Sequence, residues 1–151
     1  MAHPLNSSSP AEAAERIALS PPKVAIALRA FFRLTDAWQL SSEECRSLLG
    51  QPARATFCKW QAGRARLLSH DVIRRISWVL GIWKALQILF PDAERADAWI
   101  RRPNDLLGGQ SALQRMLAGD VSDLAEVRNL LDFVRGGDRI CTFANETWSS
   151  R

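Results

Sequence analysis

The sequence predicts an all-α protein built from short amphipathic helices. Apolar residues recur at intervals of three and four along most of the chain, which is the spacing of one helix face. Two capping boxes, S-x-x-E at Ser41 and S-x-x-Q at Ser111, indicate where helices begin. Gly50, Gly63 and Pro91 follow predicted helices and are residue types that end them. We therefore expect helices joined by tight turns.

The composition favours a compact cytoplasmic protein. A chain of 151 residues, 47% of them hydrophobic, suits one domain with tails or two small helical lobes that share a core. No apolar run reaches the ~20 residues needed to span a bilayer, and the N-terminus MAHPLNSSSP lacks the features of a secretory signal. Three widely spaced cysteines, Cys45, Cys58 and Cys141, suit neither a disulfide framework nor a zinc site. We expect no metal, no cofactor and no membrane contact.

The net charge of +4 is distributed unevenly along the chain. Residues 42–90 hold eight Arg and Lys against three Asp and Glu, which gives +5. Residues 91–137 hold six against eight, which gives −2. This asymmetry indicates a nucleic-acid face in the middle of the chain and a different task in its last third. The alternative is that both regions are ordinary solvated helix faces.

The chain begins with an expected flexible arm, residues 1–20, which is rich in Ser, Pro and Ala and nearly lacks large apolar side chains. Ser20 precedes two prolines, a pattern typical of an N-cap and a first helical turn. The first long helix is expected from Pro21 to about Leu40. The stripe that should pack into the core consists of Val24, Leu28, Phe31 and Trp38.

Two short helices with a tight turn between them follow, and their lengths are those of a helix-turn-helix. The first begins at Ser41 and ends at Gly50, and the second runs from Ala53 to about Ala62. Ala53 stands where Ser or Thr would usually cap such a helix, so this end is expected to be looser. The inward positions of the second helix are predicted to be Ala53, Phe57 and Trp60, and the outward ones Arg54, Ala55, Cys58 and Lys59.

The stretch LLGQPARATFCKWQAGRAR resembles the LLG-turn-helix-W-x-x-G pattern of Xre-type DNA-binding proteins. In such motifs the second helix enters the major groove, where Arg pairs with guanine, Thr contacts a thymine methyl and Lys neutralises phosphate. The resemblance makes Arg54, Thr56 and Lys59 the groove-facing candidates and places Arg64 and Arg66 near phosphates. Alternatively, the two helices merely build a helical core.

The longest helix is predicted from its N-cap, Ser69, to Phe90, because Pro91 cannot continue it. A helix that is apolar on several sides should be central and pack on both lobes. His70 is expected to be an exposed first-turn residue rather than a ligand or base. The buried stripe is predicted to consist of Ile73, Ile76, Leu80, Trp83 and Leu86.

Shorter elements are predicted for the last third of the chain. A helix from Asp92 to Arg102 should be followed by a tight turn with positive φ at Gly108-Gly109. The capping box at Ser111 starts a small helix, and Ser122 is expected to cap the last helix. The inward positions are predicted to be Ala96, Trp99 and Ile100 in the first of these helices, and Leu124, Val127, Leu131 and Val134 in the last.

Several short sequence features follow one another in a fixed order in this part of the chain. Together they indicate a family far more specifically than any one of them does alone. They are Phe90-Pro91, Trp99, Pro103-Asn104, Leu107-Gly108-Gly109, Glu126, Val127, Arg128, Leu131 and Arg135-Gly136-Gly137. Their order resembles the C-terminal toxin-binding segment of the Xre/MbcA/ParS-type antitoxins of bacterial toxin–antitoxin pairs. The resemblance covers about residues 21–137. It implies an Xre-like helix-turn-helix domain at 21–90 packed with a helical toxin-binding domain at 91–137.

The resemblance also implies a function. The partner would be a RES-domain toxin with an ADP-ribosyltransferase-like fold that acts on NAD, and the antitoxin would block the toxin's NAD-binding site. It would also repress its own operon through the helix-turn-helix, usually as a homodimer. The toxin-binding candidates lie on the last helix and just after it: Arg128, Asp132, Arg135, Gly136, Gly137, Asp138 and Arg139.

Two further alternatives remain open at this stage. The tail, residues 138–151, is either disordered or a peptide that folds onto a partner through Phe143 and Trp148. A stand-alone helix-turn-helix regulator would explain the basic middle of the chain but leave the last third without a task beyond dimerisation. An enzyme is the least supported class, because the sequence holds no G-x-S-x-G, H-E-x-x-H or P-loop and no cysteine with an adjacent base.

Overall fold

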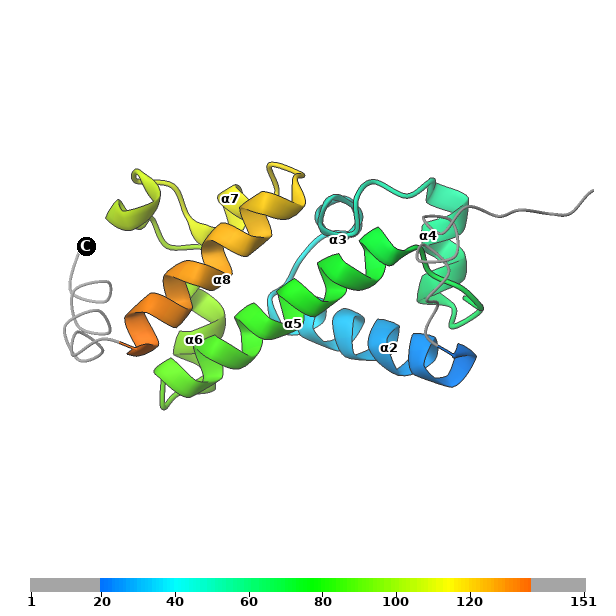
Figure 1. Cartoon of the computed structure of the whole chain (residues 1–151), viewed down its shortest axis with the longest axis horizontal. Coiled ribbons are helices and arrows are strands. Elements are labelled where there is room, and N and C mark those ends of the chain that lie inside the picture. Colours follow the sequence, from blue (N-terminus) through cyan, green and yellow to red (C-terminus); the bar gives the residue numbers. More distant parts are fainter. Residues whose placement is uncertain (1–19, 137–151) are drawn as a thin grey trace, which may run out of the picture.

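The computed structural model describes residues 20–136, and every regular element in this range is helical (Figure 1). The predicted all-α fold is confirmed. The expected arm and tail fall almost entirely outside the described residues. The helices of the described range are α2 (Pro21–Ala37), α3 (Ser42–Leu48), α4 (Arg54–Gln61), α5 (His70–Leu89), α6 (Ala93–Trp99), the 3₁₀ helix η1 (Asp105–Leu107), α7 (Ala112–Met116) and α8 (Val121–Gly136). None of these helices is long and apolar enough to cross a membrane.

Helix α5 is central, as predicted. It packs most extensively against α8, and also against α2, α6 and α3. Figure 1 shows α5 crossing the molecule with α2 on one side and α8 on the other. Its buried residues are Val72, Ile76, Val79, Ile82, Ala85, Leu86 and Leu89.

The predicted stripe of α5 is partly wrong. Ile76 and Leu86 are buried, but Trp83 is 38% exposed, and Ile73 and Leu80 are only half-buried. Because α2 and α8 cover two different sides of α5, its apolar surface is broader than one stripe. A single periodic series therefore selected the wrong centre for the buried face.

Most predicted helix starts are confirmed by hydrogen bonds. At Ser41 and at Ser111 both halves of a capping box form, with donor–acceptor distances of 2.7 and 3.2 Å at the first and 3.0 and 3.1 Å at the second. The Ser69 hydroxyl accepts a hydrogen bond from the Val72 N–H at 3.3 Å. Ser20 occupies the N-cap position of α2 and prolines follow it in the first turn, as predicted, although its side chain makes no cap hydrogen bond.

Two predictions about helix starts need correction. Helix α8 begins at Val121, so Ser122 lies within it, and the cap is made by two carboxylates instead. Asp120 accepts a hydrogen bond from the Ser122 N–H at 3.0 Å, and Asp123 accepts one from the Asp120 N–H at 3.3 Å. Ala53 is exposed at the N-cap position of α4, not inward as predicted, because the helix starts one residue later. As expected, this end has no side-chain cap.

Polar contacts join the end of α2 to the segment around α6. Helix α2 stops at Ala37, short of the predicted end, and Gln39 has a positive φ of 55°. The Arg101 guanidinium donates to the carbonyls of Trp38 and Gln39, both at 3.0 Å, and so satisfies groups that a helix end leaves unpaired. The Trp38 indole N–H donates to the Asp97 carboxylate at 3.2 Å. Burial raises the pKa of Asp97, and the hydrogen bond from Trp38 partly offsets this rise.

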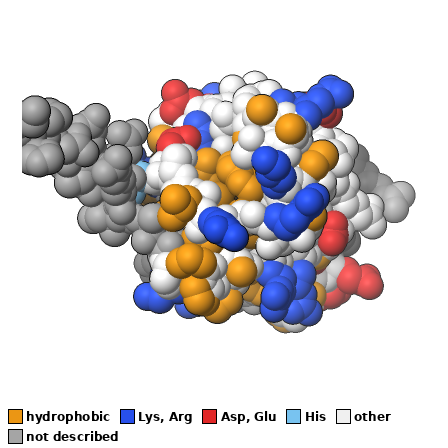
Figure 2. Space-filling model, turned by 90° about the vertical axis from the view of Figure 1, so that its right-hand side faces the viewer, with side chains coloured by type: hydrophobic (Ala, Val, Ile, Leu, Met, Phe, Trp, Pro, Cys, Tyr) orange, Lys and Arg blue, Asp and Glu red, His pale blue; other side chains and the backbone are white. Residues whose placement is uncertain are grey.

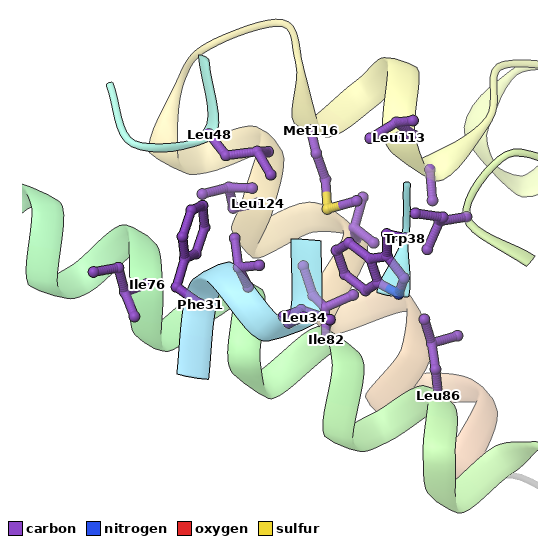
Figure 3. Packing of buried hydrophobic residues seen from close by; sticks show 14 of the residues in the cluster. Phe31, Leu34, Trp38, Leu48, Ile76, Ile82, Leu86, Leu113, Met116 and Leu124 are labelled. Atoms are coloured by element: carbon purple, nitrogen blue, oxygen red, sulfur yellow. The ribbon is translucent and has the colours of Figure 1, made fainter. Parts of the chain in front are cut away.

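One continuous apolar core spans the described residues. Figure 3 shows Trp38, the residue after α2, in this core together with Ile82 of α5 and Met116 of α7. All three side chains are at most 2% exposed. The helices on both sides of α5 therefore share their interior, as expected for two lobes with a common core.

The central role of α5 predicts different effects for two isoleucines on it. Ile82 is 0% exposed, whereas Ile88 is 55% exposed. Ile82→Ala should lower the free energy of unfolding by about 2–5 kcal/mol, because it leaves a cavity between the two sides of the core. Ile88→Ala should change it by no more than about 0.5 kcal/mol. Urea denaturation of both variants checks this, and equal losses would contradict the shared core.

Candidate functional site

The turn between α3 and α4 is held by side chains on both sides. Gly50 and Gln51 have positive φ values of 88° and 62°. The Arg46 side chain donates twice to the Pro52 carbonyl, at 3.1 and 3.0 Å, and so fixes the turn from α3. On the other side, a Cβ added to Gly50 would lie 2.9 Å from Nε of Arg75. The approach of α4 to α3 is therefore fixed by packing as well as by turn residues.

Burial orients α4 so that the predicted DNA-facing residues point outward. Phe57 and Trp60 are buried, as predicted, and both belong to the common core. The end of the molecule that carries α4 faces the viewer in Figure 2, and several Lys and Arg side chains gather on it. The five candidates are all exposed: Arg54, Thr56, Lys59, Arg64 and Arg66. The arrangement is a solvent-facing basic surface along α4 and the segment after it, suited to contact phosphates.

An acidic residue adjoins this surface, and the sequence reasoning missed it. Glu43 at the start of α3 pairs with Arg46 at 2.7 Å and with Arg54 at 3.1 Å. The Arg54 side chain is 79% exposed and that of Glu43 is 60% exposed. No spacing rule indicates this pair, because eleven residues separate the two and only the tight turn brings them together. A phosphate near Arg54 would compete with the Glu43 carboxylate.

Arg128, a predicted toxin-binding residue, lies at the seam between α8 and α5. Its Nε donates to the Asp132 carboxylate at 3.0 Å, and its Nη1 donates to the Gly81 carbonyl. A Cβ added to Gly81 would lie 3.3 Å from Nη1, which makes a glycine favourable at that position. The Arg128 side chain is only 21% exposed. Arg128 therefore joins two helices of the fold, whatever else it contacts.

The other described toxin-binding candidates lie on the last turns of α8. Asp132 and Arg135 are 3.7 Å apart, and their side chains are 40% and 42% exposed. Gly136 ends the helix and is exposed. The remaining candidates, Gly137, Asp138 and Arg139, lie outside the described residues. The described candidates therefore form a short polar surface at the C-terminal end of α8.

An aromatic side chain at this end of α8 was also missed. Phe133 is 70% exposed, although Val134 beside it is buried. The sequence does contain a sign of this, because Phe133 lies off the stripe of Leu124, Val127, Leu131 and Val134. Aromatic residues and arginine are enriched at protein–protein interfaces, so Phe133 near Arg135 is a candidate contact residue.

A surface groove lies between the first halves of α5 and α8, away from these candidates. Its volume is about 570 Å³. Its lining residues are His70, Ile73, Arg74, Ser77, Trp78, Val121, Ser122 and Ala125. His70 is exposed, as predicted. No three His, Cys, Asp or Glu side chains within residues 20–136 converge as metal ligands.

Comparison with protein families matches each half of the chain to a known type of domain. Residues 23–81 match the antitoxin Xre-like helix-turn-helix domain. Residues 85–137 match the antitoxin Xre/MbcA/ParS C-terminal toxin-binding domain. A helix-turn-helix and a toxin-binding module on one core define a helix-turn-helix antitoxin of a toxin–antitoxin system. The chain belongs to the Xre/MbcA/ParS-type antitoxin family, which confirms the resemblance seen in the sequence.

A relative over nearly the whole chain is a Sinorhizobium fredii protein named "Uncharacterized protein y4oB". It is 47% identical over 137 residues, which cover 91% of this chain and 100% of the relative. No solved structure matches the chain.

The contacts between α8 and α5 predict that substitutions of two arginines of α8 change stability by different amounts. Arg128→Met should lower the free energy of unfolding by about 1–3 kcal/mol, because it removes the partly buried hydrogen bonds to the Gly81 carbonyl and the Asp132 carboxylate. Arg135→Met removes only an exposed pair and should cost about 0.5 kcal/mol or less. Thermal and urea denaturation of the two variants measure the difference. A loss of toxin binding in the Arg128 variant has to be judged against this destabilisation.

Proposed function

We propose that this antitoxin neutralises a RES-domain toxin, with an ADP-ribosyltransferase-like fold, by blocking the toxin's NAD-binding site. The observation that carries the proposal is the match of residues 85–137 to the toxin-binding domain, because this match ends at the exposed end of α8. The protein acts here by binding and not by catalysis, in the cytoplasm. The proposed division of labour is residues 21–90 for DNA and 91–137, with the following tail, for the toxin.

The inhibitory contact is proposed at the C-terminal end of α8 and the residues that follow it. Asp132, Arg135 and Gly136 are accessible there, and Phe133 offers a large apolar surface beside them. Such an exposed aromatic residue next to an arginine has the composition of an interface anchor. Gly137, Asp138 and Arg139 would continue the contact, and Arg128 would support it from the seam with α5.

DNA binding is the second part of the proposal. The support is the exposed basic surface around α4, together with the match of residues 23–81 to an antitoxin helix-turn-helix domain. We propose that the antitoxin binds its own operator through this surface as a homodimer. A stand-alone regulator would share this activity, so the neighbouring gene separates the alternatives: a small RES-domain reading frame beside this one favours the antitoxin.

Truncation after Arg135 tests the toxin contact. The shortened protein should keep its fold, because the last core residue of α8, Val134, remains. It should no longer protect cells from the co-expressed toxin, because residues 136–151 are proposed to complete the contact. A variant that lacks residues 1–19 is the matched control, since it loses a similar length at the other end and should protect fully. Growth after toxin induction is the measurement, and full protection by the truncated protein would refute a role for the tail.

Arg54→Ala combined with Lys59→Ala tests the DNA surface. Removing two proposed contacts should weaken operator binding at least tenfold and reduce the slope of log K against log salt by about 1 to 2. Toxin neutralisation should not change. Lys84→Ala, which removes an exposed charge on α5 outside the helix-turn-helix, is the control. A gel shift at several salt concentrations gives both quantities, and an unchanged shift for the double variant would exclude these residues as DNA contacts.

A further inference from the structure

The Arg75 side chain lies where three segments of the chain meet. It belongs to α5, and its Nε donates to the Asp71 carboxylate one turn earlier, at 2.8 Å. Its Nη1 donates to the Gly119 carbonyl at 3.0 Å. The same side chain covers Gly50, as the 2.9 Å approach to a Cβ at that position shows. Only 11% of the Arg75 side chain is exposed, so its position is constrained.

Both segments that Arg75 reaches are turns with left-handed glycines. Gly50 has a φ of 88° and lies in the turn of the helix-turn-helix, whereas Gly119 has a φ of 102° and lies just before α8. Any side chain at Gly50 would be strained by this φ and would collide with Arg75. The guanidinium group therefore lies between two turns that are far apart in sequence and belong to different halves of the protein.

The charge of Arg75 also acts on the beginning of α8. Asp120 follows Gly119 and caps α8 through the Ser122 N–H. The hydrogen bond from the Ser122 backbone is the main cause that lowers the pKa of Asp120, and the nearby positive charge of Arg75 lowers it further. Arg75 thus favours the ionised cap as well as the position of the turn before it.

Within residues 20–136, the hydrogen bonds of Arg101 and Trp38 also join the two halves of the protein, but at a place other than the turn between α3 and α4. These bonds join the end of α2 to α6 and to the short segment that follows α6. Leu48 of α3 and Leu124 of α8 are buried in the same core, which Figure 3 shows, but apolar packing resists small sliding less than directed hydrogen bonds do. Arg75 packs against Gly50 in this turn, and its hydrogen bonds to Asp71 and to the Gly119 carbonyl hold it in place there.

We infer that Arg75 is a positioning residue for DNA recognition: its hydrogen bond to the Gly119 carbonyl holds its side chain against Gly50, and this packing fixes the turn between α3 and α4. The inference rests on the proposed DNA-binding function. The turn determines the direction in which α4 leaves α3, and hence where Arg54 and Thr56 stand relative to a groove. A planar guanidinium can donate to a carboxylate and a carbonyl from separate nitrogens, which a lysine ammonium at the same place cannot match.

Arg75→Met is the first test, and operator binding is measured at several salt concentrations. The affinity should fall about fivefold, the size typical of a residue in such a network. The salt slope should remain that of the wild type, because a positioning residue releases no counterions from DNA. Arg74→Met is the matched control: it removes a neighbouring, exposed charge and should not alter the affinity. A reduced salt slope for Arg75→Met, or an equal loss in Arg74→Met, would overturn the inference in favour of a charge effect.

Amide hydrogen exchange provides a readout that does not depend on DNA. In Arg75→Met, exchange should become faster at Gly50 and Gln51 and also at Gly119 and Asp120, with little change at the end of α8. Arg75→Lys keeps the positive charge and serves as a second variant in case Arg75→Met does not fold. Its amide exchange should also become faster at both turns, but by a smaller factor. Unchanged exchange at Gly50 in a folded Arg75→Lys protein would overturn the inference. If the wild type binds no operator, the DNA proposal fails while exchange still decides the role of Arg75.

Discussion

The burial of α5 on two sides is the constraint on which the rest of the structure depends. The helix belongs to the helix-turn-helix by its first half, where α2 and α3 pack on it, and to the toxin-binding module by its contacts with α6 and α8. Residues such as Ile82 and Leu86 are fully enclosed, so separating the halves would expose a large part of the apolar core. The two functional modules are consequently one folding unit, although distinct sequence patterns define them.

The parts of the fold that the sequence predicts correctly are those with local causes. A capping box needs only residues three apart, which is why Ser41 and Ser111 were identified, and a glycine with positive φ such as Gly108 needs only its own turn. The cap of α8 at Asp120 was assigned to Ser122, a shift of two residues among several polar residues that could all cap. The buried face of α5 could not be located from one periodic series, because it is determined by two neighbours far away in the chain.

The candidate site likewise has features that the sequence predicts and features that only the tertiary structure shows. The exposure of Lys59 and its neighbours was predictable, because Phe57 and Trp60 mark the opposite face of α4. The pairing of Arg54 with Glu43 and the bond from Arg128 to the Gly81 carbonyl were not, because both join residues that only the tertiary fold brings together. For arginine in particular, sequence indicates a positive charge but not whether that charge faces a partner or holds two helices together.

The positions of the two surfaces along α5 bear on how two partners could share one small antitoxin. Helix α4 lies near the N-terminal end of α5, and the end of α8 lies near its C-terminal end (Figure 1). A helix of 20 residues is about 30 Å long, so ligands at the two ends do not compete for the same side chains. Helix α5 offers a path for any influence of one proposed site on the other, and its hydrogen bonds to neighbouring segments involve Arg75, Gly81 and Gln87. The helix that holds the fold together therefore also connects the two proposed binding surfaces.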